Sequence, residues 1–381
     1  MSDTKLESQP VKASGLAGVV AGKSAIGFID GQRGILRYRG YDIHDLAEHS
    51  TFEETVYLLW NGDLPNRADL ADFVTFLASQ REVASPILEF IQSAPAEATP
   101  MGLLRTAVSA LAQYDPDAED MSLAANKRKA GRLTAQMGTL VAAIERTRSA
   151  LEPVAPDPAL GHAANFLYML RGERASEAES RALDVALVLH ADHGFNASTF
   201  SAKVTAATLS DMHSAVTSAV GTLKGPLHGG ANQRVKEALE EIGSIDRVEE
   251  WVDAKLAAKQ RIMGLGHRVY KVEDPRARHL KALAEALAEH GDPALVQISE
   301  RLVEVVRARK PLNVNVDFWS ASLYSYLGLP AALFPMIFAL SRISGWTTHI
   351  MEQYADNKLI RPRAEYVGPG PRAYVPLADR G

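Results

Sequence analysis

Two histidines and one aspartate of this chain lie among neighbours that suit them for acid–base chemistry. The first, His228, stands between Pro226 and the pair Gly229 and Gly230, just before a helical run over residues 233–242. The glycines let the backbone turn sharply and approach a ligand, and the helix start offers unpaired N–H groups with a partial positive charge. A neutral imidazole is favoured over an imidazolium at such a position. The alternative is an ordinary loop histidine between two helices.

The second histidine, His267, lies in the segment GLGHRVYKVEDPR over residues 264–276. It follows two glycines, and three cations follow within ten residues: Arg268, Lys271 and Arg276. Backbone N–H groups exposed by glycine, together with cations, suit a polyanionic ligand. The alternative is an exposed basic loop without a ligand.

The aspartate, Asp317, ends the alternating run of residues 313–317 and precedes the apolar stretch of residues 318–327. An aspartate in front of an apolar helix is most often an N-cap. The alternative is a carboxylate that projects from the helix start into a cleft and acts as a base.

A metal site is a competing interpretation of a fourth segment, which carries His190, Asp192 and His193. A spacing of three residues can place two imidazoles on one helix face, but zinc sites usually need a third ligand and supporting partners. The alternative is a polar helix end with hydrogen-bonded core histidines. On periodicity alone, Arg342 and Arg361 are surface or helix-end arginines.

Composition excludes several classes of function. The chain has no cysteine, so it has no disulfide, catalytic thiolate or cysteine-ligated metal. Its net charge of −5 argues against a nucleic-acid-binding surface. The first twenty residues lack the basic start and apolar run of a secretory signal. The longest apolar run, Leu329–Leu340, contains two prolines and is too short to cross a bilayer. We therefore expect a cytoplasmic protein without a membrane segment.

The elements that must position these groups are almost all helices. Residues 26–38 alternate around the turn Asp30–Gly34, which predicts one β-hairpin near the N-terminus. Helical periodicity covers most of the remaining chain, with capping boxes expected at Thr51–Glu54 and Ser176–Glu179.

A rise in charge near residue 230 predicts two domains. The smaller helical domain would comprise residues 230–327, and the larger one residues 1–229 and 328–381. We expect a mostly α fold with the ligand bound in the cleft between the domains.

In combination, these segments resemble the citrate synthase family. GPLHGGANQ is similar to the family's first histidine motif, GLGHRVYKVEDPR to its second and NVNVDF to its aspartate motif. HADHGFNAS, SRISGWTTHIMEQ, LIRPR and the hairpin FIDGQRGILRYRGYDI resemble further family segments, in family order from about Ser24 to Arg363. The resemblance implies the two-domain helical fold of that family. The short N-terminus resembles the short, dimeric type rather than the hexameric form inhibited by NADH.

The resemblance implies an acyltransferase that joins acetyl-CoA to oxaloacetate and hydrolyses the thioester, giving citrate and CoA at the entry to the tricarboxylic acid cycle. Asp317 would take a proton from the acetyl methyl group, and His228 would hydrogen-bond the thioester oxygen of the enolate. His267 would polarise the ketone of oxaloacetate and donate a proton to the new alcohol.

The resemblance also assigns binding residues. The carboxylate-binding arginines would be Arg276, Arg342 and Arg361, with Arg361 supplied by the partner subunit of a homodimer. His193 would contact oxaloacetate, assisted by Asn196.

CoA would lie along the backbone of Met263, Gly264, Leu265 and Gly266, with Lys271 on a phosphate and Arg268 as a weaker candidate. The CoA thioester is a substrate, and no metal or redox cofactor is implied.

Three alternatives remain open at this point. 2-Methylcitrate synthase, which uses propionyl-CoA, shares all of these motifs. A metal-dependent hydrolase would be built on His190, Asp192 and His193, and a non-catalytic helical scaffold would merely have kept the fold. For the condensing enzyme we expect the smaller domain to close on the larger one, because the enolate must be shielded from water.

Overall fold

The fold is known from a computed structural model, which describes residues 14–16, 18–289 and 291–381. Within these residues the helices are α1 (Ile43–His49), α2 (Phe52–Asn61), α3 (Arg67–Ser79), α4 (Ser85–Gln92), α5 (Pro100–Leu111), α6 (Leu123–Arg148), α7 (His162–Arg171), α8 (Glu177–His190), α9 (Ala197–Ala206), α10 (Met212–Leu223), α11 (Ala231–Ile242), α12 (Val248–Ala257), α13 (Ala277–Ala288), α14 (Ala294–Arg309), α15 (Val316–Tyr326) and α16 (Phe334–Ala355). Short 3-10 helices are η1 (Ser14–Leu16), η2 (Ala112–Tyr114), η3 (Ile245–Arg247), η4 (Ala331–Leu333) and η5 (Leu377–Asp379). The predicted mostly helical fold is confirmed. The sequence indicates no secretory signal in the first twenty residues. Most of these residues lie outside the described part of the chain.

The predicted N-terminal hairpin is present. Strand β1 (Gly27–Asp30) pairs antiparallel with β2 (Ile35–Tyr38), and Asp30 lies opposite Ile35. A third strand, β3 (Tyr41–Asp42), pairs with β2 and was not predicted. Two residues are too few for the alternation of side chains that reveals a strand in a sequence.

Helix α16 lies at the centre of the core. Most of its side chains are buried, and it packs against α6, α8, α9 and α10. The helix continues to Ala355 through a stretch beyond residue 343 in which Ser and Thr are frequent. The hydroxyl of Thr347 donates to the Ile343 carbonyl at 2.8 Å and that of Thr348 to the Ser344 carbonyl at 2.6 Å. These bonds let polar side chains lie inside a buried helix.

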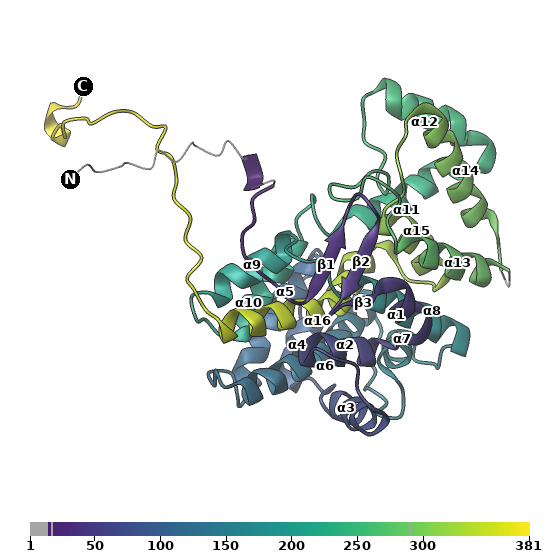
Figure 1. The fold of residues 1–381 in the computed structure, drawn as a ribbon, viewed down its shortest axis with the longest axis horizontal. Coiled ribbons are helices and arrows are strands. Elements are labelled where there is room, and N and C mark those ends of the chain that lie inside the picture. Colours follow the sequence, from purple (N-terminus) through teal and green to yellow (C-terminus); the bar gives the residue numbers. More distant parts are fainter. Residues whose placement is uncertain (1–13, 17, 290) are drawn as a thin grey trace.

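Helices α11 to α15 pack against one another and form a smaller group beside the other helices (Figure 1). This group falls within the predicted smaller domain, residues 230–327, whose boundaries stay a prediction. It meets the rest of the chain where α13 packs against α8 and where His44 Nδ1 lies 2.7 Å from His279 Nε2. Among the described residues, no helix is both long and apolar enough to cross a membrane.

The C-terminal tail leaves the helical body after α16 (Figure 1). Residues 361–381 are all exposed, including the large apolar side chains of Tyr366, Val367 and Tyr374. Arg361 lies at the start of this exposed stretch. The tail therefore covers no surface of its own chain within the described residues.

Candidate active site

The loop that carries His267 and the segment that carries Asp317 are paired through their backbones. Leu265 and Val314 form an antiparallel bridge, flanked by bonds from Gly266 N–H to the Asn313 carbonyl (2.7 Å) and from Asn315 N–H to the Gly264 carbonyl (3.0 Å). Gly264 has a φ of +79°, and a Cβ there would lie 2.7 Å from a Val235 methyl carbon. Only glycine fits this crossing without strain.

Asp317 lies in the first turn of α15, but it is not the N-cap. The cap is Asn315, whose Oδ1 accepts the Asp317 N–H at 3.0 Å. The expectation of a simple cap at Asp317 is therefore wrong. Burial raises the pKa of the Asp317 carboxyl to about 6, against the opposing effect of the Arg276 cation. A carboxyl of this kind changes charge close to neutral pH.

His267 is held in one tautomer by its own loop. Its Nδ1 accepts the N–H groups of Val269 (2.9 Å) and Tyr270 (3.0 Å), so the proton of the neutral ring lies on Nε2. Burial lowers the pKa of His267 to about 4, which keeps the ring neutral at pH 7. His267 can therefore donate a hydrogen bond through Nε2 without carrying charge.

His228 is fixed in the opposite tautomer. Its Nε2 accepts the Ser198 N–H at 3.3 Å and lies 2.8 Å from the Ser198 hydroxyl oxygen, so the ring proton lies on Nδ1. Burial lowers the pKa of His228 to about 4, and the Arg342 cation lowers it further. The Gly229 backbone sits so tightly that a Cβ there would lie 2.4 Å from the Leu223 carbonyl oxygen. His228 is thus a neutral donor on a tightly packed turn at the start of α11.

Arg276 and Arg342 are buried cations rather than surface residues. Arg276 is 2% exposed and pairs with the Asp274 carboxylate through Nε (2.9 Å) and Nη2 (2.7 Å). Arg342 is 1% exposed, lies in the middle of α16 and donates from Nε to the His190 carbonyl at 2.7 Å. None of the hydrogen bonds found among the described residues uses the terminal amino groups of Arg342. The periodicity-based view of Arg342 as a surface arginine is wrong.

These two guanidinium groups connect the three candidate catalytic residues. The Arg342 cation lowers the pKa of both His228 and Asp317, after the larger effect of burial on each. The Arg276 cation likewise acts on the pKa of both His267 and Asp317. Groups far apart in the sequence are therefore within electrostatic reach of the same two cations. Arg361, in contrast, is exposed in the single chain.

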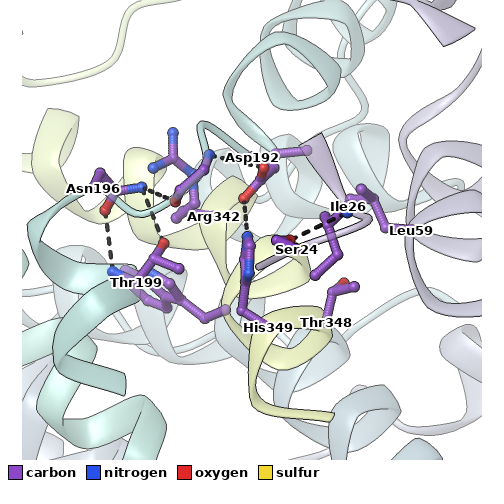
Figure 2. Close-up of polar contacts among 12 residues, drawn as sticks. Ser24, Ile26, Leu59, Asp192, Asn196, Thr199, Arg342, Thr348 and His349 are labelled. Atoms are coloured by element: carbon purple, nitrogen blue, oxygen red, sulfur yellow. Dashed lines mark hydrogen bonds and ion pairs between the residues drawn. The ribbon is translucent and has the colours of Figure 1, made fainter. Parts of the chain in front are cut away.

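The side chains proposed for a metal site point to different partners. His190 Nδ1 donates to the Ala186 carbonyl at 2.8 Å, Asp192 Oδ1 lies 3.0 Å from His349 Nε2, and His193 Nε2 lies 3.1 Å from the Tyr270 hydroxyl. Figure 2 shows the Asp192 carboxylate facing His349. In the part of the chain that is described, no group of three His, Asp or Glu side chains is placed to hold a metal ion. The geometry thus gives no support to the metal-dependent hydrolase.

His193 and Asn196 lie on the turn between α8 and α9. The rings of His193 and His267 are 5.6 Å apart, and burial holds the pKa of His193 well below its usual value. Asn196 caps α9, because its Oδ1 accepts the Thr199 N–H at 3.1 Å and its Nδ2 donates to the Thr199 hydroxyl at 3.0 Å (Figure 2). His193 therefore lies beside a candidate catalytic ring, whereas both ends of the Asn196 amide are already bonded.

The residues predicted to hold CoA lie on the same loop, and they range from buried at Gly264 to exposed at Arg268 and Lys271. The backbone of Gly264 and Gly266 is already paired with the segment before α15, as described above, while Met263 and Leu265 are partly exposed. Arg268 and Lys271 are exposed, and Lys271 Nζ lies 3.4 Å from the Arg268 carbonyl oxygen. The two cations are therefore close together and accessible.

Sequence reasoning missed three side chains that support the site. Ser198 contacts His228 and also accepts from Trp346 Nε1 at 3.1 Å, Tyr270 contacts His193, and His349 contacts Asp192. All three lie inside segments that the sequence had singled out. Their roles depend on partners far away in the chain, so no local spacing could reveal them.

The family model described as "Citrate synthase, C-terminal domain" matches residues 15–363. The chain belongs to the citrate synthase family. It is 49% identical over 368 residues to citrate synthase 2 of Bacillus subtilis, covering 96% of this chain and 98% of that protein. A citrate synthase of Thermoplasma acidophilum, solved as a ternary complex with carboxymethyl coenzyme A and oxaloacetate, superposes with a TM-score of 0.91 at 34% identity, covering 96% of this chain and 98% of the other.

Relatives named 2-methylcitrate synthase also belong to this set. That of Shewanella oneidensis is 39% identical and matches all of both chains. Five relatives named citrate synthase are 44–49% identical to this chain over nearly their full length, which favours that function over 2-methylcitrate synthase. The predicted family and acyltransferase class are therefore confirmed.

Proposed function

We propose that this protein condenses acetyl-CoA with oxaloacetate and uses water to release citrate and CoA, the reaction that opens the tricarboxylic acid cycle. The environment of Asp317 carries the proposal. Its carboxyl group is buried, its pKa is raised to about 6, and it lies near the cations of Arg276 and Arg342. A base with this pKa is suited to proton transfer near neutral pH, and two guanidinium groups suit a substrate with two carboxylates.

In the first step, Asp317 takes a proton from the methyl group of acetyl-CoA. The electron pair of the broken C–H bond moves into the enolate, whose oxygen accepts a hydrogen bond from Nδ1 of His228. A neutral donor is useful here because its position is fixed before charge develops on the oxygen. The tautomer of His228 supports this assignment, since the Ser198 N–H occupies Nε2 and leaves Nδ1–H as the donor.

In the second step, the enolate carbon attacks the ketone carbon of oxaloacetate and forms the new C–C bond. Nε2–H of His267 polarises the ketone oxygen and gives it a proton as the alcohol forms, and the proton that Asp317 took from the methyl group returns the ring to its neutral form. Water then cleaves the thioester of citryl-CoA, which releases CoA and citrate.

Oxaloacetate is held by cations. Arg276 and Arg342 bind its two carboxylates, and His193 contacts it beside His267. We assign Arg361 to the same task in the neighbouring subunit of a homodimer, because its own chain leaves it exposed and away from the other cations. Asn196 contributes chiefly by capping α9 and so holding the turn that carries His193.

CoA lies against the loop that precedes His267. The adenine ring contacts the backbone of residues 263–266, and Lys271 binds a phosphate with Arg268 nearby. The reaction needs no metal or redox cofactor, because all of its proton transfers have a donor or acceptor among the residues above. We place the protein in the cytoplasm.

The test is a coupled assay of CoA release with oxaloacetate plus either acetyl-CoA or propionyl-CoA. We expect a higher kcat/KM with acetyl-CoA. One methylene is worth about 1–3 kcal/mol in a fitted pocket, so the preference should reach about tenfold or more. A preference for propionyl-CoA would assign the chain to 2-methylcitrate synthesis. Absence of CoA release with either thioester would contradict the proposed function.

A further inference from the structure

The turn of the β1–β2 hairpin rests on the loop that follows His267, although the two lie in different halves of the sequence. The N–H of Lys271 donates to the carbonyl of Gly31 at 2.8 Å. A Cβ at Gly31 would lie 2.3 Å from the Val269 carbonyl oxygen, so the two backbones are in direct contact. Figure 1 shows the hairpin reaching from the larger body toward the group of α11 to α15.

The turn itself is fixed before it meets the loop. Asp30 Oδ1 accepts the N–H groups of Gln32 and Arg33, each at 3.0 Å, which is the bonding of a tight Asx-type turn. Gly34 has a φ of +66°, and a Cβ there would lie 2.9 Å from a Val272 methyl carbon. The hairpin therefore presents a rigid, side-chain-free surface to the loop.

One peptide group that contacts the hairpin also orients His267. The peptide between Val269 and Tyr270 turns its carbonyl toward Gly31 and donates its N–H to His267 Nδ1 at 3.0 Å. The Val269 side chain is 41% exposed and that of Val272 40%, so packing of their own side chains holds this part of the loop only weakly. The hairpin contact therefore adds to the buried side chain of Tyr270, which is 3% exposed, in fixing the backbone around His267.

We propose that the hairpin turn is a positioning element for the reaction, and that Gly31 and Gly34 are positioning residues for His267. Gly31 holds the peptide between Val269 and Tyr270 in place, and the N–H of this peptide holds the His267 ring in the tautomer that presents Nε2–H. The proposal rests on the proposed function, in which His267 polarises the ketone. The hairpin lies in the predicted larger domain and the loop in the smaller one. This contact therefore also couples the orientation of His267 to the relative position of the two domains.

The decisive variant is Gly31→Ala. Gly31 does not have a positive φ, so alanine can adopt its backbone conformation, and the added methyl group is excluded chiefly by the Val269 carbonyl, with a Val269 methyl carbon also close at 3.1 Å. We expect a fall in kcat of about 10-fold to 100-fold, because a shift of about 1 Å in a catalytic group can have that effect. The Gly31→Val variant should lower kcat further.

A second measurement reports on the His267 ring directly and does not depend on enzymatic activity. In a ¹H–¹⁵N NMR titration of the full chain, the His267 ring of Gly31→Ala should show a higher pKa than in the wild type, by about one unit or more, because the loosened ring is better hydrated. The ¹⁵N shifts should also report loss of the single tautomer with its proton on Nε2. A role of Gly31 in folding alone would leave both signals unchanged in the folded protein.

Two variants serve as controls for Gly31→Ala. Gln32→Ala changes an exposed side chain in the same turn, and Gly221→Ala adds a methyl group in α10 whose nearest contact is an ordinary 3.7 Å to Arg105 Cδ. Both should keep wild-type kcat and the wild-type His267 titration. The proposal is overturned if folded Gly31→Ala keeps kcat within about twofold and an unchanged His267 signal. If the wild type itself releases no CoA, the proposed function fails, while the titration still decides whether the hairpin orients the ring.

Discussion

Leu265 pairs with Val314 across an antiparallel bridge, and this pairing makes one unit of two segments that lie 49 residues apart. The first segment leads into His267 and the second into Asp317. Asn315 strengthens the connection, because its Nδ2 donates to the Gly266 carbonyl at 2.9 Å while its Oδ1 caps α15. The proposed acid and the proposed base are therefore positioned by a shared backbone contact rather than separately.

The first prediction concerns Asn315→Ala. Loss of the cap should lower the free energy of unfolding by about 0.5–2 kcal/mol. Loss of the bond to Gly266 should also shift the loop of His267 against Asp317, so we expect kcat to fall by about tenfold or more. Denaturant unfolding and the CoA-release assay measure the two effects.

Asn66→Ala is the matched control for that variant. Asn66 caps α3 in the same way, accepting the N–H groups of Ala68 (2.9 Å) and Asp69 (3.0 Å), but it lies on the surface away from the site. It should lower stability by a similar amount and leave kcat unchanged. If Asn315→Ala behaved like Asn66→Ala in both measurements, the shared contact would have no role in catalysis.

The second prediction concerns Asp317→Asn, which should lose activity and gain stability. Removal of a general base costs about 10²–10⁴ in rate. Burial raises the pKa of this carboxyl to about 6 from 3.8, so the charged form is penalised in the folded state. The neutral Asp317 carboxyl makes its full contribution to the free energy of unfolding below pH 4, and this contribution is lost as the pH rises through about 6. At pH 7 the asparagine variant should therefore be more stable by about 1–3 kcal/mol, the range implied by a pKa shift of this size.

The pH dependence of stability and of kcat distinguishes a general-base role of Asp317 from a purely structural one. The gain in stability of Asp317→Asn should shrink between pH 7 and pH 4.5 in urea unfolding. In the wild type, kcat should fall as the pH drops through about 6, because the base becomes protonated. An asparagine variant that was less stable than the wild type at pH 7 would show that Asp317 serves the fold instead.

Sequence reasoning found the local features of this protein and missed those that depend on distant partners. The hairpin, the cap at Asn66 and the capping box of Ser176 and Glu179 were all predictable, because each depends on residues a few positions apart. The expected box at Thr51 is only half formed, with Thr51 Oγ1 accepting the Glu54 N–H.

The candidate site shows the same division. His228, His267 and Asp317 stood out through their neighbours in the sequence, and family resemblance supplied their roles. The burial of Arg342 was not predictable, because it results from α8, α9 and α10 packing around α16. The partners of Ser198 and His349 are likewise decided by tertiary packing.

The third prediction separates binding from stability at Arg276. Arg276→Ala should raise the KM for oxaloacetate by about 10-fold to 100-fold through loss of a charged hydrogen bond. It should also lower the free energy of unfolding by about 3–5 kcal/mol, because the buried Asp274 carboxylate loses its partner. Adding Asp274→Asn should restore much of the stability and leave KM high. A double variant with wild-type KM would mean that Arg276 acts only through Asp274.

The fourth prediction concerns removal of metal ions. Since His190, Asp192 and His193 turn toward separate partners, condensation should proceed at the same rate after dialysis against EDTA. Rates before and after dialysis, with and without added Zn²⁺, provide the measurement. Loss of activity that returned with the ion would support the metal-dependent alternative.

The fifth prediction tests whether Arg361 acts across a subunit interface. Arg361→Ala and Asp317→Asn should each be nearly inactive as pure proteins. In a mixed dimer, however, the site of the Arg361→Ala subunit keeps its own Asp317 and receives Arg361 from its partner. That one site should be intact, whereas the other site lacks both groups.

Mixing the two variants under conditions that exchange subunits should therefore restore activity. Random pairing makes about half of the dimers mixed, each with one working site of two, so about a quarter of wild-type kcat per site is expected. The result depends on the direction of the contribution, because an Arg361 that served its own chain would leave both sites of the mixed dimer defective. Mixing Arg361→Ala with Arg342→Ala gives an independent check, since Arg342 is buried within its own chain and should complement in the same way. Restoration in neither mixture, with subunit exchange verified, would show that Arg361 is not supplied across the interface.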